Sequence, residues 1–366
     1  MKVVHLTTVH PPFDNRIFHK QAKTLVKAGY DVTLIVQHER DEVVEGIKIL
    51  ALPQSQSRFR RIFFLTWRAF WLALRQKANV YHLHDPELIP VGLALKVLTR
   101  ARVVYDVHED YPQQVLSKGW LPAWLRPWVA RGITELEVLA ARVFGGLVAA
   151  TPTIARRFPP HKKVVVRNFP RLEEFASARS GLIYTQRPLR VVYIGGITAI
   201  RGAVEMVQAI AQVEGDVELV LAGAFESLAL QKQLTRLPGW QRTRFVGWLS
   251  RAQVAELLGR ARIGLVVLAP LQRYRVALPV KLFEYMAAGI PFVASDFPLW
   301  REIGEGAGLF VDPQKPDEIA QAIQWLLTHP YEAQAMGARG RQLVETKYNW
   351  DHEARQLLEF YERLLA

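Results

Sequence analysis

The chain has 366 residues, half of them apolar, so it is too long for one typical domain and can form two hydrophobic cores. It contains no cysteine, which excludes disulfide bonds and thiol catalysis. The net charge of +13 is concentrated in residues 1–180, which hold 27 Lys or Arg against 15 Asp or Glu, whereas residues 181–366 hold 20 against 19. The N-terminal half therefore faces an anionic partner: nucleic acid, anionic lipid or a phosphorylated substrate.

The N-terminal half alternates strand patterns with helix patterns. Strands are predicted at residues 3–7, 31–36, 47–52, 80–84, 103–107, 147–150 and 164–166, and helices at residues 16–28 and 61–77. The opening residues form a strand pattern too short for a signal peptide, and no apolar run is long enough to span a membrane. We therefore expect a cytoplasmic protein.

The same alternation restarts after a polar, irregular segment. Strands are predicted at residues 191–194, 217–221, 244–246, 263–268 and 292–294, and helices at residues 203–212, 228–236, 252–259 and 316–327. Repeated alternation predicts the α/β class with two doubly wound parallel-sheet domains. The predicted organisation is a domain at residues 1–170, a linker at 171–189, a domain at 190–347 and a last helix at 348–366 that crosses back to the first domain. Ligands are expected at the carboxyl ends of the strands, in the cleft between the domains.

The most informative segment is residues 279–296, which predicts a short helix, a sharp stop and a buried strand. Lys281 and Glu284 are nearly one turn apart near the helix start, and Gly289 with Pro291 ends the helix. A helix start and a lysine favour phosphate, and a carboxylate can accept hydrogen bonds from a sugar diol. The alternative is an ordinary surface ion pair.

Several motifs resemble those of GT-B glycosyltransferases, specifically glycosyltransferase family 4, in the order in which that family has them. They are Val-Val-Arg-Asn-Phe-Pro at 165–170, Val-Tyr-Ile-Gly-Gly-Ile-Thr-Ala-Ile-Arg-Gly at 192–202, Leu-Val-Leu-Ala-Gly at 219–223, Phe-Val-Gly-Trp-Leu-Ser at 245–250 and Tyr-Asn-Trp at 348–350. The resemblance covers nearly the whole chain. It implies two facing Rossmann-like domains and retaining transfer of a hexose from a UDP- or GDP-sugar, with no metal and no cofactor.

The resemblance also implies roles for single residues of the C-terminal domain. Glu284 matches the second glutamate of the family's Glu-x7-Glu motif, which binds the donor ribose, but Val276 stands where the first glutamate is expected. Lys281 is similar to a lysine that contacts the diphosphate, and Arg201 stands where lysine is common and keeps the positive charge. The absence of the first glutamate, with Val276 in its place, leaves open whether transfer retains or inverts the sugar configuration. The donor-binding residues implied are Gly195, Gly196, Arg201, Gly223, Gly247, Lys281 and Glu284.

In the N-terminal domain, His108 matches the histidine that relatives aim at the donor sugar. This implies a catalytic role, and the alternative is a satisfied polar residue at a strand end. His82, His84 and Asp85 lie at the end of the preceding strand, where a role in lining the cleft is favoured over metal binding. An inverting enzyme would need a base, for which Asp85, Glu109 and Asp110 are the candidates.

The first strand-to-helix loop lacks the glycine pair that many relatives have. Asp14 or Asn15 is expected to cap the following helix. Arg16 can instead contact the diphosphate or an anionic acceptor, and the two interpretations have similar weight. Asp14, Arg16, Asp85 and Glu109 are thus candidates for the acceptor site or the cleft.

Residues 58–77 carry six positive charges, no negative charge and many large apolar side chains. This is the composition of an interfacial membrane helix, although a helix packed on the sheet with a solvated basic stripe remains an alternative. A second aromatic and basic patch lies at residues 118–128. Together they favour peripheral attachment to the inner face of the cell membrane and a lipid-linked or saccharide acceptor of cell-envelope biosynthesis. The predicted membrane contacts are Arg61, Trp67, Arg68, Trp71, Arg75, Trp120 and Trp124.

Two other functions compete with sugar transfer. A GT-B sugar-nucleotide epimerase would convert the donor without any acceptor. A nucleic-acid-binding protein is suggested by charge alone, but no recognition motif supports it, and the aromatic residues cluster with apolar ones instead of forming stacking platforms. We therefore expect no nucleic-acid partner.

Overall fold

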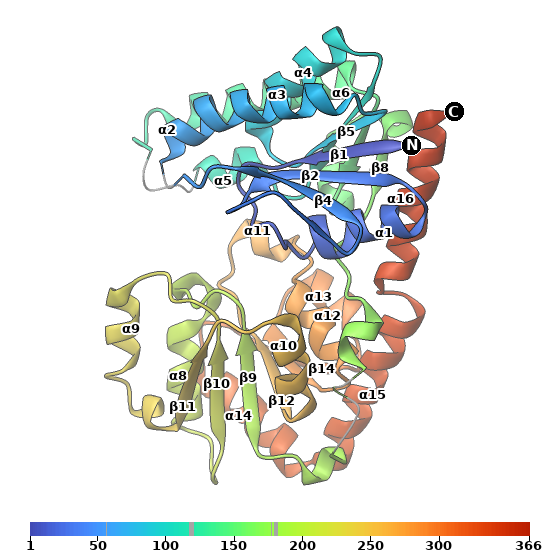
Figure 1. Ribbon diagram of the computed structural model, residues 1–366. Coiled ribbons are helices and arrows are strands. Elements are labelled where there is room, and N and C mark those ends of the chain that lie inside the picture. The colour runs from blue at the N-terminus through green and yellow to red at the C-terminus, as the bar shows by residue number, and fades with distance from the viewer. Residues whose placement is uncertain (56, 117–120, 177, 179–181) are drawn as a thin grey trace. The chain divides into compact units, whose positions relative to one another are not determined.

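The alternating strand and helix patterns form two parallel sheets, one in each of two units of the computed structural model (Figure 1). The first unit comprises Met1–Asn168 and Asp351–Ala366, and the second comprises Phe169–Trp350. The structure describes residues 1–55, 57–116, 121–176, 178 and 182–366. The predicted class, two α/β parallel-sheet domains, is confirmed.

The sheet of the first unit has the strand order β3-β4-β2-β1-β5-β6-β7-β8. Every pairing is parallel except that of the edge strand β3, which returns antiparallel to β4 in a hairpin. Its strands are β1 (Lys2–Leu6), β2 (Asp31–Gln37), β3 (Glu42–Val44), β4 (Ile47–Leu52), β5 (Val80–Leu83), β6 (Arg102–Val107), β7 (Gly146–Ala149) and β8 (Lys163–Val165).

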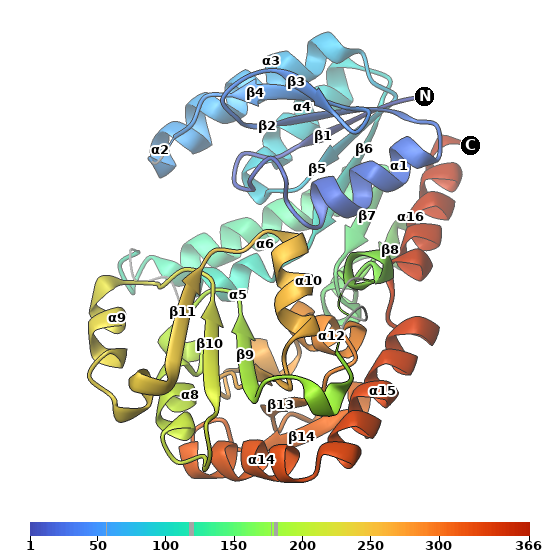
Figure 2. The same cartoon turned by 60° about the horizontal axis from the view of Figure 1, so that its bottom comes forward.

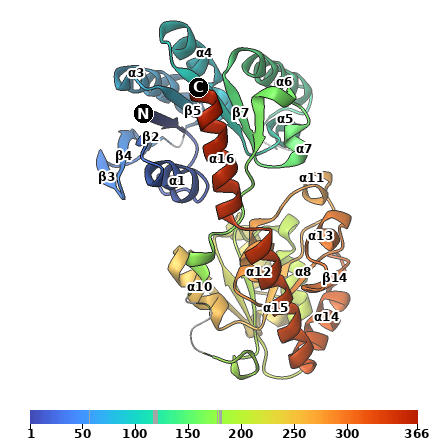
Figure 3. The same ribbon diagram turned by 90° about the vertical axis from the view of Figure 1, so that its right-hand side faces the viewer.

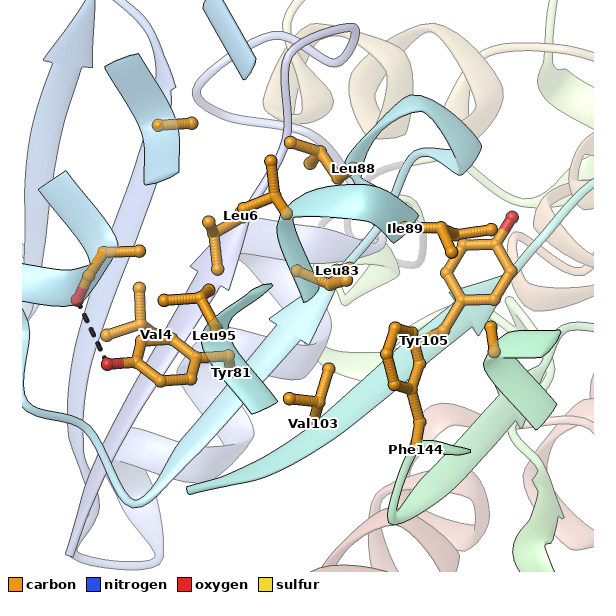
Figure 4. Close-up of a cluster of buried hydrophobic side chains, with 14 of the residues drawn as sticks. Val4, Leu6, Tyr81, Leu83, Leu88, Ile89, Leu95, Val103, Tyr105 and Phe144 are labelled. Atoms are coloured by element: carbon orange, nitrogen blue, oxygen red, sulfur yellow. Dashed lines mark hydrogen bonds between the residues drawn. The ribbon is translucent and has the colours of Figure 1, made fainter. Parts of the chain in front are cut away.

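The two faces of this sheet differ because successive side chains of a strand point to opposite sides. One face carries the apolar cluster shown in Figure 4, in which Leu6, Tyr81 and Val103 of β1, β5 and β6 pack together with Phe144. The Tyr81 hydroxyl is satisfied inside this cluster because it donates to the carbonyl oxygen of Ala73 at 3.2 Å. The opposite face of the same three strands carries the fully buried polar side chains of His5, His82 and Asp106.

The helical segments of the first unit connect consecutive strands. They are η1 (Ile17–Ala22), α1 (Lys23–Lys27), α2 (Arg58–Arg60), η2 (Arg61–Leu65), α3 (Thr66–Gln76), η3 (Pro86–Leu88), α4 (Ile89–Leu98), α5 (Tyr111–Leu116), α6 (Arg126–Val143), α7 (Pro152–Ala155), η4 (Pro160–Lys162) and α16 (Trp350–Leu365). The predicted helix at 61–77 is thus the C-terminal part of a continuous helical stretch from Arg58 to Gln76.

The C-terminal helix α16 packs on the first unit (Figure 3). Its Tyr361 is fully buried, and the Tyr361 hydroxyl lies 2.7 Å from Nδ1 of His82. Phe360 occupies the space beside Gly146, where an added Cβ atom would approach the phenyl ring to 2.3 Å. The last helix therefore completes the core of the first unit.

The sheet of the second unit is entirely parallel, with the order β11-β10-β9-β12-β13-β14; Figure 2 shows β11, β10 and β9 side by side. Its strands are β9 (Arg190–Ile194), β10 (Glu218–Ala222), β11 (Thr243–Gly247), β12 (Ile263–Val266), β13 (Phe292–Ser295) and β14 (Gly308–Val311). The segment 171–189, interpreted from the sequence as a linker, lies within this unit, and Phe175 and Tyr184 are buried in its apolar clusters.

The helical segments of the second unit also connect its strands or pack beside them. They are η5 (Leu172–Phe175), η7 (Tyr184–Gln186), η8 (Ala199–Arg201), α8 (Ala203–Ile210), α9 (Leu228–Leu234), η9 (Pro238–Arg242), α10 (Arg251–Gly259), α11 (Gln272–Arg275), α12 (Val280–Ala287), α13 (Pro298–Ile303), α14 (Pro316–Thr328) and α15 (Pro330–Thr346). The segment 279–296 forms α12, a turn at Gly289 with φ of 67°, and β13, as its sequence predicts.

Candidate functional site

Three neighbouring strands of the second unit end in glycines with positive φ: Gly195 after β9, Gly223 after β10 and Gly247 at the end of β11. A Cβ atom on Gly223 would lie 2.0 Å from the carbonyl oxygen of Gly195, so no side chain fits between these two turns. Backbone without side chains at the carboxyl edge of a parallel sheet lets a phosphate approach closely.

Lys281 of α12 points its amine at this glycine turn. The Lys281 Nζ atom is buried and lies 3.8 Å from the centre of the Tyr193 ring. A Cβ atom built on Gly195 would lie 3.4 Å from the same Nζ atom. Among the described residues, this amine has no hydrogen-bond partner. Burial, and secondly the nearby Arg201, hold the pKa of Lys281 well below its ordinary value.

Arg201 lies on the other side of the same turn. A Cβ atom on Gly196 would lie 2.9 Å from the Nη1 atom of Arg201, and the Arg201 side chain also meets the hydroxyls of Tyr193 and Tyr274. Tyr193 in turn donates from its hydroxyl to the carbonyl oxygen of Gly196 at 2.8 Å. Two cations and open backbone thus converge on one place, which is the composition of an anion site.

Glu284 is buried one turn beyond Lys281, where it forms an ion pair. Its Oε1 accepts from Arg251 Nη1 at 2.6 Å, and the same guanidinium donates to Glu174 at 2.8 Å. The cation of this pair is Arg251 and not Lys281, and the pair is buried, so the described residues do not show the surface ion pair that was the alternative from the sequence. Val276, in the position expected for a glutamate, follows α11 and is 37% exposed.

In the first unit, Arg16 and Asp106 form a buried ion pair on the polar face of the sheet. Arg16 donates from Nε and Nη2 to the two carboxylate oxygens of Asp106 at 3.0 and 2.9 Å, and from Nη1 to the carbonyl of Val166 at 2.7 Å. Burial alone would raise the pKa of Asp106, but the Arg16 guanidinium holds this pKa well below its ordinary range. All three nitrogens of the Arg16 guanidinium thus donate inside the protein, and the contact of Arg16 with a diphosphate or an anionic acceptor stays a prediction.

His108 follows β6 and lies against a second histidine, His10. The two Nε2 atoms are 2.9 Å apart, and the Tyr111 hydroxyl lies 3.3 Å from Nε2 of His108. The other nitrogen of His108, Nδ1, lies 3.7 Å from Asp106. Burial lowers the pKa of His10, but Asp14 and Asp85 more than offset it, and the resulting pKa is raised.

The remaining acidic candidates of this unit organise the loops. Asp14 Oδ1 accepts from the backbone of Arg16 and Ile17 at 2.8 and 2.9 Å, which is the capping role predicted from the sequence. Asp85 Oδ2 accepts from the backbone of Thr8 at 2.6 Å and from the Thr7 hydroxyl at 2.9 Å. Asp85 therefore fixes the loop that follows β1.

Histidines also gather behind this edge of the sheet. The ligand atoms of His5, His82 and His84 lie within 4.8 Å of one another, as do those of His84, Asp106 and His108. However, Nδ1 of His5 and Nε2 of His84 are 2.8 Å apart in a direct hydrogen bond, and Asp106 Oδ2 accepts from both Arg16 and Gln21. Both sets would have to break these bonds to hold a metal ion, so the geometry favours a hydrogen-bonded polar core.

Comparison with solved structures shows that the fold is shared by glycosyltransferases. Sucrose-phosphate synthase from Thermosynechococcus elongatus is similar with a TM-score of 0.79 and 19% identity over 99% of this chain and 98% of that one. Anabaena HepE, solved in complex with UDP-glucose, is similar with a TM-score of 0.75 and 15% identity over 99% of this chain and 100% of that one.

Sequence comparison agrees with the fold. Residues 15–168 match the family described as "Glycosyl transferase 4-like domain", and residues 201–359 match that described as "Glycosyl transferase-like". A curated relative, the glycogen synthase of Mycobacterium tuberculosis, is 21% identical over 99% of this chain and 94% of its own length. The chain is a GT-B glycosyltransferase. The predicted resemblance to this group is thereby confirmed.

The glycosyltransferase exposes most of its predicted membrane contacts. Trp67, Trp71 and Trp124 are 60%, 43% and 73% exposed, and Arg68 and Arg75 are exposed as well. Arg61 is an exception because it forms a two-point ion pair with Glu87 at 2.9 and 3.1 Å. Trp120 lies outside the described residues. Within the part of the chain that is described, no helix has the length and apolar composition needed to cross a bilayer.

Sequence reasoning missed two partners that determine what the candidate site residues of the glycosyltransferase do. His10 lies in the loop that follows the first strand, yet it contacts His108 across 98 positions of sequence. Arg251, which lies at the start of α10, neutralises Glu284 across 33 positions of sequence. The only available signal was that each follows a predicted strand end, where parallel strands gather ligands. Glu109, by contrast, is exposed and bonds to Gln114, five residues further along the chain.

Proposed function

We propose that this glycosyltransferase is of the family 4 type and transfers a hexose-type sugar from a UDP- or GDP-sugar to a membrane-associated saccharide or lipid-linked acceptor. The observation that carries the proposal is the buried amine of Lys281, which faces the Gly195 turn without a hydrogen-bond partner among the described residues. A buried cation without a partner is costly unless a ligand anion completes it. The diphosphate of a nucleotide sugar is such an anion.

The role of each residue follows from its place in the second unit. Lys281 and Arg201 neutralise the departing nucleoside diphosphate, and the glycine turns at residues 195–196 and 223 allow its oxygens to approach the backbone. Glu284 holds the ribose with the carboxylate oxygen that Arg251 does not bind. Gly247 ends the neighbouring strand with open space where a Cβ atom would be, so this edge can accept the rest of the nucleotide.

We infer that transfer retains the sugar configuration and needs no metal. In such a reaction the leaving phosphate itself can take the proton of the acceptor hydroxyl. The candidate bases for inversion each have a partner: Asp85 accepts from the loop after β1, Asp110 pairs with Arg157 at 3.2 Å, and Glu109 accepts from the side-chain amide of Gln114. We propose that His108 contributes a polar group to the transfer and not a base.

A thermal-shift screen of nucleoside diphosphates and their sugars tests the donor assignment. A ligand that binds only the folded state raises the melting temperature. At a ligand concentration a hundredfold above its Kd, the free energy of unfolding rises by about 2.7 kcal/mol. We expect UDP or GDP, and the sugars derived from it, to raise the melting temperature, whereas the free sugars do not. If no nucleoside diphosphate raises it, the donor site is wrongly assigned.

The membrane part of the proposal rests on one surface of the first unit, the aromatic face of α2, η2 and α3. Six large apolar side chains on it are 40–72% exposed, which is unusual for a soluble surface. They are Phe59, Ile62, Phe63, Phe64, Trp67 and Trp71. Exposed arginines at positions 58, 60, 68 and 75 lie among them. Aromatic side chains with basic neighbours suit the interface of an anionic membrane, so we place the enzyme peripherally on the cytoplasmic face, in cell-envelope biosynthesis.

Binding to vesicles tests this surface. We expect wild-type protein to sediment with vesicles that contain anionic lipid. The double variant W67S/W71S should bind these vesicles at least about tenfold more weakly, because two interfacial aromatic side chains are lost. Added salt should weaken the binding further because the arginine contribution is screened. Trp325→Ser in the second unit is the matched control. Equal sedimentation of wild type and the double variant would contradict the proposed surface.

A further inference from the structure

His10 and His108 of the first unit share one hydrogen bond. His10 lies in the loop after β1 and His108 follows β6, and their Nε2 atoms are 2.9 Å apart. A hydrogen bond between two ring nitrogens needs a proton on one of them and a lone pair on the other. The groups around each ring therefore indicate which histidine donates.

The contacts of His108 make its Nε2 atom the acceptor. The Tyr111 hydroxyl, which can donate, lies 3.3 Å from this same Nε2 atom. On the other side of the ring, Nδ1 lies 3.7 Å from Oδ1 of Asp106, and this carboxylate, which is paired with Arg16, can only accept. His108 is therefore the tautomer that carries its proton on Nδ1 and its lone pair on Nε2.

The contacts of His10 make it the donor. Its Nδ1 atom lies 3.7 Å from Oδ2 of Asp14, and its Nε2 atom lies 3.5 Å from Oδ1 of Asp85. Each nitrogen thus faces a carboxylate, which suits an imidazolium with a proton on both nitrogens. Burial lowers the pKa of His10, but Asp14, Asp85 and Glu109 more than offset this effect, so the pKa is raised.

We propose that His10 is a positioning residue for His108, whose ring it fixes in one tautomer by donating a hydrogen bond from Nε2. The inference rests on the proposed function, in which His108 contributes a polar group to the transfer. Asp14 keeps a proton on Nδ1 of His10, so deprotonation removes the proton from Nε2. Two lone pairs then face each other across 2.9 Å, and the bond that orients the His108 ring is lost.

The nitrogen-15 chemical shifts of the histidine rings, measured by NMR on the ligand-free full chain, test the tautomer. We expect His108, assigned by the loss of its signals in His108→Gln, to be protonated on Nδ1 and not on Nε2. His10→Phe keeps an aromatic ring but has no donor, so His108 should no longer be a single tautomer in this variant. His161→Gln replaces an exposed histidine of the same unit and should leave the His108 signals unchanged. A wild-type His108 that is protonated on Nε2 would overturn the inference.

The pH dependence of transfer tests the functional consequence. The release of UDP from UDP-glucose and of GDP from GDP-mannose is followed with an alkyl glucoside as the acceptor. In wild type we expect kcat/KM to fall as the pH rises through the pKa of His10, which lies above its ordinary value of 6.5. His10→Gln has an N–H donor at every pH, so it should transfer sugar without this fall. His10→Phe should lower kcat/KM by about 10- to 100-fold at all pH values, as expected for loss of one hydrogen bond from a charged group.

The glutamine variant separates positioning from a purely structural role. A His10→Gln variant as slow as His10→Phe would overturn the inference, and so would a fall with pH that persists in His10→Gln. If wild type releases neither UDP nor GDP, the proposed function fails, which is a different result, because the ring signals of His108 still decide whether His10 fixes its tautomer.

Discussion

Replacing Lys281 by methionine is expected to abolish sugar transfer and to make the folded protein more stable. The variant removes a buried amine that has no hydrogen-bond partner among the described residues, and it keeps an unbranched side chain of similar length over the Tyr193 ring. Loss of one charged donor to the leaving group should lower kcat/KM by about 100- to 1000-fold. Removal of a buried polar group that has no hydrogen bond among the described residues should raise the free energy of unfolding by about 1 kcal/mol or more. Steady-state kinetics and chemical denaturation measure the two effects.

Lys232→Met serves as the control for Lys281→Met, since Lys232 is exposed on α9. It should change neither transfer nor stability by a measurable amount. A Lys281→Met variant that transfers sugar at the wild-type rate would remove the donor assignment. One that is inactive but strongly destabilised would show instead that Lys281 is a structural residue.

Replacing Arg16 by methionine is expected to cause the largest loss of stability in the first unit. Asp106 is fully buried, and the Arg16 guanidinium supplies two of its hydrogen bonds. Removal of one partner of a buried ion pair leaves an uncompensated charge and costs about 3–5 kcal/mol. Differential scanning calorimetry should show an earlier transition of the first unit, whereas the second unit, which contains no part of this pair, should keep its own transition.

Arg40→Met is the matched control for this stability prediction. Arg40 is 80% exposed and its pair with Glu42 has an N–O distance of 3.6 Å, so its loss should cost less than about 0.5 kcal/mol. If Arg16→Met unfolds no more readily than Arg40→Met, the polar core is not held by this pair. Nucleotide binding to the second unit of Arg16→Met is expected to be unchanged.

Sequence patterns predicted the sheets well because parallel strands buried on both faces are continuous apolar runs. They failed where packing and not periodicity determines the element. The helix α15 is an example: Gly337 faces the backbone of Gly289, and a Cβ atom there would lie 2.3 Å from its carbonyl oxygen. Glycines in a helical stretch lower its apparent helix propensity, although here they allow close contact. The edge hairpin strand β3 is only three residues long and was likewise missed.

The candidate site was predictable in position but not in its partners. Lys281 and Glu284 could be placed at one helix start because helical spacing is local. The groups that surround these two side chains could not be predicted from the sequence. Arg251 reaches Glu284 from another helix, and Tyr193 reaches Lys281 from a strand 88 positions earlier. The same holds for Arg16, whose partner Asp106 lies 90 positions away. The sequence therefore indicated which side chains carry chemistry, and the fold determined which of them are already bonded.

The most direct test of the donor site is the proton exchange that accompanies nucleoside diphosphate binding. Burial lowers the pKa of Lys281 in the ligand-free protein, and a bound diphosphate raises it again. At a pH between these two values, binding must take up a proton, so the measured heat depends on the ionisation enthalpy of the buffer.

We therefore expect titrations of UDP and GDP in phosphate and in Tris, repeated over a range of pH below the ordinary pKa of lysine, to show uptake of a proton, up to about one per site, by wild type and none by Lys281→Met. Binding without proton uptake, or with equal uptake in the two proteins, would contradict the assignment of Lys281 as the residue that completes the diphosphate site.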